Sequence, residues 1–394
     1  MLSSLTVRGR ALLAGGVVSV VASPLAGQPL LLAGGLLVLV LVALSLAVSG
    51  RRADDTTVSR VLSSGVVQAG SPVVVRAQLG ADTAAALQWE EQLPWSLGPR
   101  PRVVTTGREW HHFDYRVAPP TRGRFPLGPM EVRRGDPFGL VERRWSAGGE
   151  TPLLVTPATV TLPVLGLGGA MSASGEQRPR AFASGSAEDV TVRDYRRGDD
   201  LRRVHWRSTA RVGELMVRRE EQPWQARATV FLDNRAGAHR GPGPASSFEA
   251  AVSAAASICA HLVGLGFTVR LVSAAQVVVP AATVSSPLLE ALAEIETTPA
   301  RVVDPRVFAE QTALTVGVVG GTGPEGLEPL RRARVQSGMA LAVVVSSGQW
   351  GPEPPSHTAE AAALIRHAGW RTVEFGRADA LAEVWAMLGV AGRA

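Results

Sequence analysis

The sequence contains one cysteine and no lysine, and both shortages narrow the kinds of site that it can form. With Cys259 alone, the chain cannot build an intrachain disulfide framework or a metal site made of several cysteines. Cys259 lies in an apolar run, which is typical of a buried, inert thiol rather than a nucleophile. All 40 basic residues are arginine, so the high isoelectric point follows from composition and is weak evidence for a nucleic-acid partner.

The motifs of several common enzyme classes are also missing. The sequence has no Gly-x-Ser-x-Gly elbow, no phosphate-binding loop ending in Gly-Lys-Ser/Thr and no His-Glu-x-x-His pair. His111 and His112 are adjacent, so in a strand they face opposite sides and cannot jointly hold a metal. His205, His239 and His261 lie in unrelated settings. We therefore expect no catalytic residue, no cofactor and no enzyme activity.

Charge is absent from a long stretch near the N-terminus, between Arg10 and Arg51. Residues 29–48 supply the roughly 20 apolar residues that a bilayer-spanning helix needs. Residues 11–26 form a shorter, glycine-rich apolar stretch before it. The pattern predicts a two-helix transmembrane hairpin within residues 1–52.

Proline and glycine in the segment 23–29 predict a tight turn between the two helices. Arg8 and Arg10 precede the first helix, and Arg51 and Arg52 follow the second, so a hairpin places all four on one side. The positive-inside rule makes that side cytoplasmic, in a multi-pass protein of the plasma membrane. The alternative is a cleaved signal peptide, which would leave the second stretch as an anchor and the bulk of the chain outside.

Three further regions follow along the chain. Residues 55–160 contain short β-branched or alternating runs separated by Gly, Pro and Asp clusters, which predicts an antiparallel β-sandwich. Residues 161–185 are rich in glycine and serine and predict a flexible linker. Within residues 226–394, apolar strands alternate with helices, the longest capped by Ser246 or Ser247, which predicts a doubly wound α/β domain.

Asp233 ends the first strand of that α/β region, where parallel sheets bind their ligands. A carboxylate there can hold Mg²⁺ if other oxygen ligands lie nearby. The hydroxyls at later strand ends, Thr322, Ser346 and Ser347, are scattered, and Arg235 opposes a cation electrostatically. We therefore expect Asp233 to act as a turn or capping residue and to bind no metal.

The segment 186–225 is the most densely charged part of the chain. Residues 185–222 contain nine arginines and eight acidic residues, a net charge of only +1. This near balance indicates a self-paired network rather than a phosphate or nucleic-acid surface. We expect a strand, a turn, a helix over 201–211 and a second strand, with His205 packed on the helix and Trp206 as a large anchor.

The charged segment also has a pattern that resembles the bacterial "domain of unknown function 58" family. The opening residues LTVRGRALLAGG, the paired apolar stretches, TRGRFPLGP, GDPFGL and the trailing α/β region are similar to that family as well, so the resemblance covers essentially the whole chain. The matching positions in the charged segment are Arg193, Tyr195, Gly198, Asp199, Asp200, Arg202, His205, Trp206 and Arg211.

This resemblance implies that the C-terminal domain is similar to von Willebrand factor type A domains. In those domains the first strand ends in a metal-binding Asp-x-Ser-x-Ser sequence. Aligned on Asp233, the two serine positions hold Arg235 and Gly237, so the motif is degenerate. Related genes often accompany MoxR-type AAA+ ATPases and transglutaminase-like membrane proteins, which implies an adaptor or assembly role by association.

The sequence thus predicts a membrane-anchored, non-enzymatic scaffold that contacts the lipid bilayer through residues 11–48. Its expected protein partner is a MoxR-type AAA+ ATPase, in the assembly or maturation of envelope-associated complexes, and it has no nucleic-acid partner. Two alternatives stay open. One is a hydrolase that uses the polar cluster from Arg193 to Arg211, and the other is a metal-dependent adhesion domain that uses Asp233.

Overall fold

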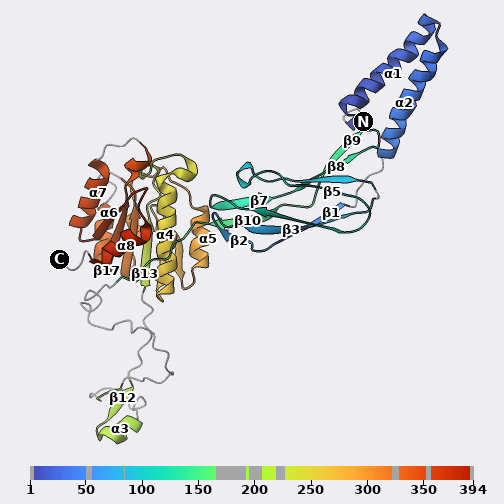
Figure 1. Cartoon of the computed structure of the whole chain (residues 1–394). Coiled ribbons are helices and arrows are strands. Elements are labelled where there is room, and N and C mark those ends of the chain that lie inside the picture. Colours follow the sequence, from blue (N-terminus) through green and yellow to red (C-terminus); the bar gives the residue numbers. More distant parts are fainter. Residues whose placement is uncertain are drawn as a thin grey trace. The chain divides into compact units, whose positions relative to one another are not determined.

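The chain folds into two compact units, each described by itself below (Figure 1). One unit contains Met1–Ala158 with Leu292–Glu294, and the other contains Thr159–Ala291 with Ile295–Ala394. The computed structural model describes residues 4–49, 56–83, 85–165, 192–194, 206–218, 227–321, 328–351 and 356–390.

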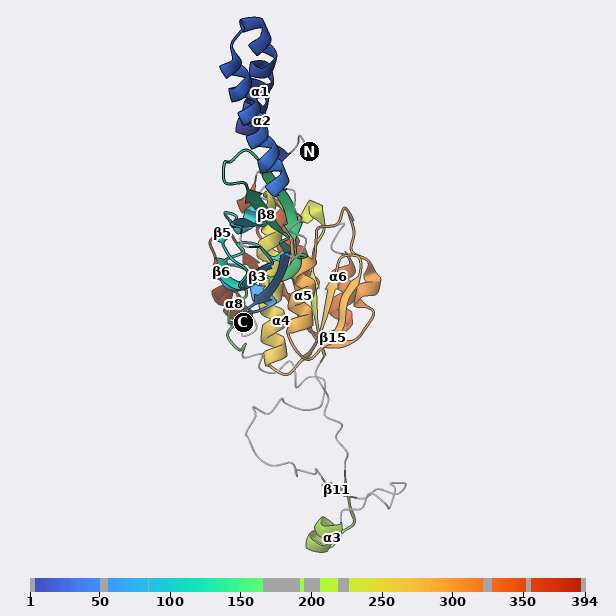
Figure 2. The same ribbon diagram turned by 90° about the vertical axis from the view of Figure 1, so that its right-hand side faces the viewer.

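The N-terminal apolar stretches form two helices, α1 (Val7–Ala26) and α2 (Pro29–Ser49), that lie side by side in Figures 1 and 2. Both are long and apolar enough to cross a membrane, and they fit membrane anchoring. A Cβ added to Gly35 of α2 would lie 2.9 Å from the backbone oxygen of Gly16 in α1. The two helices therefore approach closely through glycine, as membrane helices do when small residues face each other.

Helix α1 begins earlier than the sequence predicts, whereas it ends at Ala26 as predicted. The helix begins at Val7 because the side chain of Thr6 accepts a hydrogen bond from the Gly9 N–H, so the early arginines lie in its first turn. At the other end the helix continues through Pro24 to Ala26. The proline removes a backbone hydrogen bond, but this loss falls in the last turn, because only two helical residues follow Pro24. Gly27, with φ of 61°, ends the helix, so the predicted seven-residue turn is much shorter.

In the described residues 56–156, ten strands follow, in three sheets of order β1-β3-β6, β2-β10-β7 and β5-β4-β8-β9. All pairs are antiparallel except the parallel pair β2–β10, an exception to the predicted antiparallel arrangement. The strands are β1 (Thr56–Leu62), β2 (Val66–Gln68), β3 (Val73–Ala81), β4 (Leu87–Glu91), β5 (Arg102–Thr105), β6 (His111–Val117), β7 (Gly123–Leu127), β8 (Met130–Gly135), β9 (Glu142–Ala147) and β10 (Thr151–Thr156).

Strand β3 links the two cores of this β-rich region. Its first half contributes Val73 and Val75 to a cluster with residues of β6, β7 and β10. Its second half contributes Ala77 and Leu79 to a cluster with residues of β4 and β8. These residues alternate along one face of β3, so the apolar alternation in the sequence correctly predicts a buried strand face.

A buried ion pair also ties the β-rich region together. Arg60 of β1 and Glu91 of β4 lie 3.0 Å apart, with side-chain exposures of 2 % and 0 %. Burial raises the pKa of Glu91, and hydrogen bonds from Arg60 partly offset that effect. A Cβ on Gly128 would lie 2.6 Å from Arg60 Nη2, so the glycine of the LGP sequence makes room for the guanidinium.

The start of α1 is docked on the turn between β8 and β9. Thr6 donates from its backbone N–H to the Leu140 carbonyl at 2.9 Å and from its hydroxyl to the Gly139 carbonyl at 2.8 Å. Leu5 forms an antiparallel bridge with Val141, and both are buried. A Cβ on Gly9 would come within 2.2 Å of the Leu140 oxygen, so only glycine fits there. Two of the motifs that resemble the family, LTVRG and GDPFGL, therefore meet in space.

The second unit contains a six-stranded sheet of order β15-β14-β13-β16-β17-β18. Every neighbouring pair is parallel except β14–β15, where β15 is an antiparallel edge strand. The strands are β13 (Arg227–Leu232), β14 (Thr268–Ser273), β15 (Val277–Ala282), β16 (Thr312–Val319), β17 (Ser337–Val345) and β18 (Arg371–Phe375), and the helices are α4 (Ser247–Gly264), α5 (Ser286–Glu294), α6 (Glu328–Val335), α7 (Ser356–His367) and α8 (Leu381–Val390).

Helices cover both faces of this sheet (Figure 1). Leu330 of α6 and Ile365 of α7 join a core cluster on one face. On the other, α4 packs on β13 and β14, and its His261 ring lies 5.8 Å from that of Trp385 in α8. Although α4 is also long and apolar enough to cross a membrane, most of it is buried in this core. The predicted α/β region is confirmed, and the Ser246 side chain caps α4 by accepting from the Glu249 N–H.

Candidate functional site

Asp233 lies at the carboxyl end of the central strand β13 and is fully buried. The guanidinium of Arg235 binds it through two parallel hydrogen bonds, Nε to Oδ1 and Nη2 to Oδ2, each of 2.8 Å. The Arg235 side chain is itself only 3 % exposed. Both carboxylate oxygens are thus engaged by an internal cation, in the fork geometry that makes arginine–carboxylate pairs strong.

The residues after Asp233 fasten the neighbouring segments to this pair. Asn234 accepts from the Ala274 N–H at 3.1 Å, next to the end of β14, and donates to the Glu296 carbonyl at 2.8 Å. Arg235 Nη1 donates to the Arg301 carbonyl at 3.1 Å. The arrangement joins three chain segments through polar side chains that are almost completely buried.

His239 continues the network toward α4. Its Nε2 lies 2.6 Å from the Asp233 carbonyl and its Nδ1 lies 3.2 Å from Ser247 Oγ. The Asp233 carbonyl can only accept, so Nε2 carries the proton and Nδ1 accepts from the serine hydroxyl. Burial lowers the pKa of His239, the nearby Asp233 raises it less, and Arg235 and Arg240 lower it further. The ring is therefore neutral at pH 7 and serves as a hydrogen-bonded link.

The carboxyl end of the adjacent strand β16 is covered by the backbone of the loop after β13. Gly320, directly after β16, lies so near the loop after β13 that a Cβ on it would come within 2.3 Å of the Ala238 oxygen. Ser347, after β17, is fully buried, whereas Thr322 lies outside the described residues. Among the residues described, no three His, Cys, Asp or Glu side chains gather as a metal site. Chemically, the cluster can hold loops in place, but its carboxylate has no oxygen free of the guanidinium.

The charged segment predicted to carry the family motif is described in part. Arg193 lies in β11 (Val192–Asp194), which pairs with β12 (Met216–Arg218), and Arg211 lies in α3 (Trp206–Val212). Trp206 was predicted to be an anchor, but 70 % of its surface is exposed. The predicted helix 201–211 corresponds to α3 from Trp206 onward, and residues 201–205 lie outside the described part of the chain. Six motif residues lie outside the described part of the chain: Tyr195, Gly198, Asp199, Asp200, Arg202 and His205.

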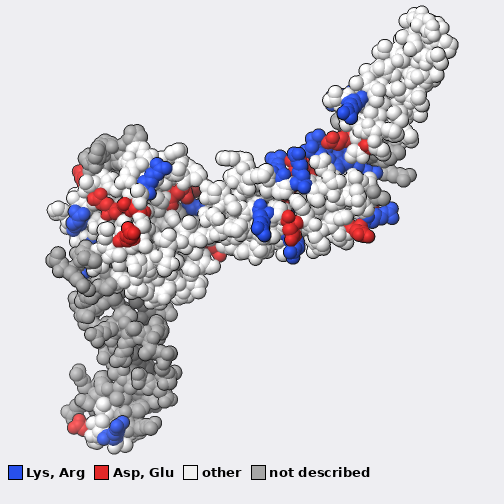
Figure 3. Space-filling view, viewed as in Figure 1, with Lys and Arg blue, Asp and Glu red and all other residues white. Residues whose placement is uncertain are grey.

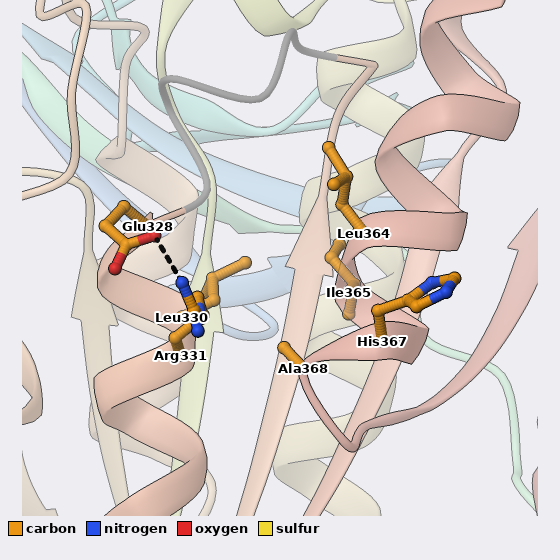
Figure 4. Close-up of a pocket in the computed structure, with 7 residues that line it drawn as sticks. All are labelled: Glu328, Leu330, Arg331, Leu364, Ile365, His367 and Ala368. Carbon is orange, nitrogen blue, oxygen red and sulfur yellow. Dashed lines mark hydrogen bonds and ion pairs between the residues drawn. The ribbon is translucent and has the colours of Figure 1, made fainter.

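A small hollow lies between α6 and α7 (Figure 4). Its volume is about 240 Å³, below the range of pockets for small molecules. Leu330 and Ile365 form its apolar part, and the Glu328–Arg331 ion pair, 3.4 Å long, lies at its rim. His367 is the one titratable ring that lines it, and its Nδ1 already bonds to the Ala363 carbonyl. This hollow holds no nucleophile with an adjacent base.

The positions of the single cysteine and of the two adjacent histidines indicate a structural rather than a catalytic role. Cys259 is fully buried in α4, and burial raises the pKa of its thiol, which is the setting of an inert residue. His111 and His112 are successive residues of β6 and therefore face opposite sides of the strand.

The buried state of His239 predicts that the α/β unit loses stability in mild acid. An unfolded histidine titrates near pH 6.5, and the folded ring has a lower pKa, so the unfolded state binds more protons between these values. The contribution of His239 to the free energy of unfolding is therefore fully present above about pH 6.5 and is lost as the pH drops below it. The melting temperature between pH 8 and pH 5 measures this slope.

The variant His239→Gln should flatten that slope, because the amide can still donate to the Asp233 carbonyl but cannot be protonated. His261→Gln is the matched control: burial also lowers the pKa of His261, but its ring is less buried, so it should remove less of the slope. An acid-induced loss that is unchanged in His239→Gln would contradict the prediction.

The solved structures with some similarity to this chain include two β-glucosidases. A β-glucosidase from Erythrobacter marinus and one from Listeria innocua are each 11 % identical over 24 % of this chain, with TM-scores of 0.14. The chain spans 16 % of the length of these enzymes. Likenesses this weak indicate neither a shared fold nor glycosidase activity. None of the curated proteins matches the chain.

A family comparison is more informative. The model of the family described as "Protein of unknown function DUF58" matches residues 191–355. This range contains the family motif from Arg193 to Arg211, Asp233 with Arg235, and the sheet as far as β17. The resemblance seen in the sequence is confirmed over residues 191–355, which match the model of the DUF58 family.

Proposed function

We propose that this protein is a membrane-anchored scaffold whose α/β domain binds a protein partner without using a metal. The observation that carries this proposal is the buried Asp233–Arg235 pair, in which a guanidinium takes the place that a cation would need. A divalent ion would have to displace Arg235 and leave its charge buried and unpaired, which typically costs several kcal/mol.

The α/β domain is similar to a von Willebrand factor type A domain in this proposal. The strand order and the antiparallel edge strand β15 support that assignment, as does the position of Asp233 at the end of the first strand. The residues present do not fit the metal of that fold. Arg235 and Gly237 stand where the motif has serine hydroxyls, and both Asp233 oxygens bond to Arg235.

In the membrane, α1 and α2 form a hairpin, and the soluble units lie in the cytoplasm. Arg8 and Arg10 in the first turn of α1 support this orientation, as do Arg51 and Arg52 after α2 in the sequence. The docking of Thr6 on the β8–β9 turn keeps the β-rich region on the same side as these arginines.

The partner in this proposal is a MoxR-type AAA+ ATPase, with a role in assembling or maturing envelope-associated complexes. The family resemblance supports this partner by association. The docking surface is the helix α3 and the residues after it, where Trp206, Val212 and Leu215 are 70 %, 59 % and 40 % exposed beside Arg211. Aromatic and arginine side chains are the residues that most often dominate protein interfaces.

Co-purification tests the partner. The full chain would be co-expressed with the MoxR-type ATPase of the same organism, solubilised in mild detergent and captured by a C-terminal tag. We expect the ATPase to be recovered with wild type and at least about tenfold less with Trp206→Ala, because a buried interface tryptophan commonly contributes 2 kcal/mol or more. Trp95→Ala is the matched control: Trp95 is 92 % exposed in the β-rich region and should have no effect. Equal recovery with all three chains, or none with wild type, would refute this partner.

Limited proteolysis tests the side of the membrane. In spheroplasts, external protease should leave the β-rich and α/β units intact, because the cytoplasmic orientation protects them, and should degrade them once the membrane is lysed. A periplasmic protein is the positive control for digestion in intact spheroplasts. Cleavage of the soluble units before lysis would support instead the reading with a cleaved signal peptide.

A further inference from the structure

Two arginines near one end of the β-rich region lie opposite each other on neighbouring strands. Arg134 of β8 and Arg143 of β9 are directly opposite in the antiparallel ladder. In the part of the chain that the structure describes, neither has an ion pair or hydrogen bond, and Arg143 Nε is shielded from solvent with no acceptor. Like charges directly opposite destabilise a sheet. The geometry therefore fits an anion between the two guanidinium groups.

Other arginines of the same sheet have carboxylates as partners. Arg133 binds Glu90 at 3.1 Å and Glu131 at 2.9 Å, and Arg102 binds Glu90 at 2.9 Å. Arg133 is itself opposite Arg144, which also has acidic partners. On one face of the sheet, acidic side chains thus neutralise the charge of the neighbouring arginines. The arginines whose charge is not neutralised in this way are Arg134 and Arg143.

The unpaired arginines lie close to the start of α1. One further pair, Gly135 with Glu142, separates them from the turn that holds Leu5, Thr6 and Gly9. Two residues of strand rise about 7 Å. The uncharged stretch begins directly after Arg10, so the hydrocarbon surface lies at the first turns of α1, and the headgroup layer outside it is about 5 to 8 Å thick. In a bilayer crossed by α1 and α2, this spacing would place Arg134 and Arg143 near the depth of the lipid phosphates.

The tip of the same turn is suited to the interface as well. Phe138 is 55 % exposed there. Asp136 accepts from the backbone N–H groups of Phe138 at 3.1 Å and Val141 at 2.6 Å, so its charge is committed to the turn. Figure 3 shows basic side chains, with acidic ones among them, near the base of the hairpin, whose visible remaining surface carries almost no charge. The exposed aromatic side chain of Phe138 beside basic side chains is typical of the boundary between the hydrocarbon core and the lipid headgroups.

We propose that Arg134 and Arg143 bind the phosphate of an anionic phospholipid headgroup in the leaflet at which α1 begins. Guanidinium forks bind phosphate oxygens bidentately, and two of them favour a headgroup with net negative charge over a zwitterionic one. The bound lipid would remove the repulsion across β8–β9 and fix the β-rich region against the bilayer. This inference rests on the proposed membrane insertion of α1 and α2.

Native mass spectrometry of the full chain in a mild neutral detergent tests the site. Phosphatidylglycerol or phosphatidylcholine is added, and the lipids that stay bound are counted. We expect wild type to retain phosphatidylglycerol in preference to phosphatidylcholine and the variant Arg134→Gln/Arg143→Gln to bind it at least tenfold more weakly. The matched control is Arg133→Gln/Arg144→Gln, which removes the same charge from the cross-strand pair one position away and should retain the lipid.

Several results would overturn the proposal. These are equal retention of both lipids by wild type, an undiminished affinity in Arg134→Gln/Arg143→Gln, and displacement of the lipid by millimolar inorganic phosphate, which would indicate a free-phosphate site. Arg134→Lys/Arg143→Lys keeps the charge and removes the forks, so partial retention by this variant confirms a folded site if the glutamine variant is unstable. Flotation with liposomes separates the two proposals, because a chain that does not float refutes membrane insertion itself.

Discussion

The buried ion pair between Asp233 and Arg235 is the interaction on which the α/β domain depends. An isolated carboxylate at the end of a central strand would be too costly to bury, and the guanidinium two residues later neutralises it within the same loop. The carbonyl of Asp233 then holds His239, and Asn234 and Arg235 hold the segments around Ala274 and Arg301. The end of the sheet where parallel sheets commonly bind ligands is therefore occupied by the chain's own polar groups.

The arginines of this chain differ in their burial and in their acidic partners, and these differences support the functional argument. Arg60 and Arg235 are buried, and each is matched to one buried carboxylate, which gives geometric definition rather than reactivity. Arg133 lies at the surface of a sheet among several acidic groups. Among the described residues, Arg134 and Arg143 have no carboxylate partner, and they lie beside the start of α1, so their charge points to a partner outside the protein.

The order of elements follows from the sequence because its signals are strong and local. The long apolar runs, the alternation in β3 and the Ser246 cap of α4 each correspond to an observed element. Weak signals account for the elements that were missed. Strand β1 alternates without one fully buried residue, β15 contains a proline at a sheet edge, and α6 buries only Leu330 and Ala333 among its arginines.

The candidate site was harder to anticipate. Spacing showed that Arg235 follows Asp233 by two residues and opposes a cation, but the fork between them depends on tertiary burial that a sequence does not encode locally. The register of Arg134 against Arg143 depends likewise on how β8 and β9 pair. Trp206 shows the reverse case, because a large aromatic residue suggested burial and the described helix exposes it.

The central claim, that Arg235 replaces a metal ion at Asp233, is tested most directly by calorimetric titration of the full chain in detergent with Mg²⁺ and Mn²⁺. The account predicts only heats of dilution and an unchanged melting temperature, because both carboxylate oxygens are bound to the guanidinium. Saturable binding of one ion per chain that Asp233→Asn abolishes would contradict it.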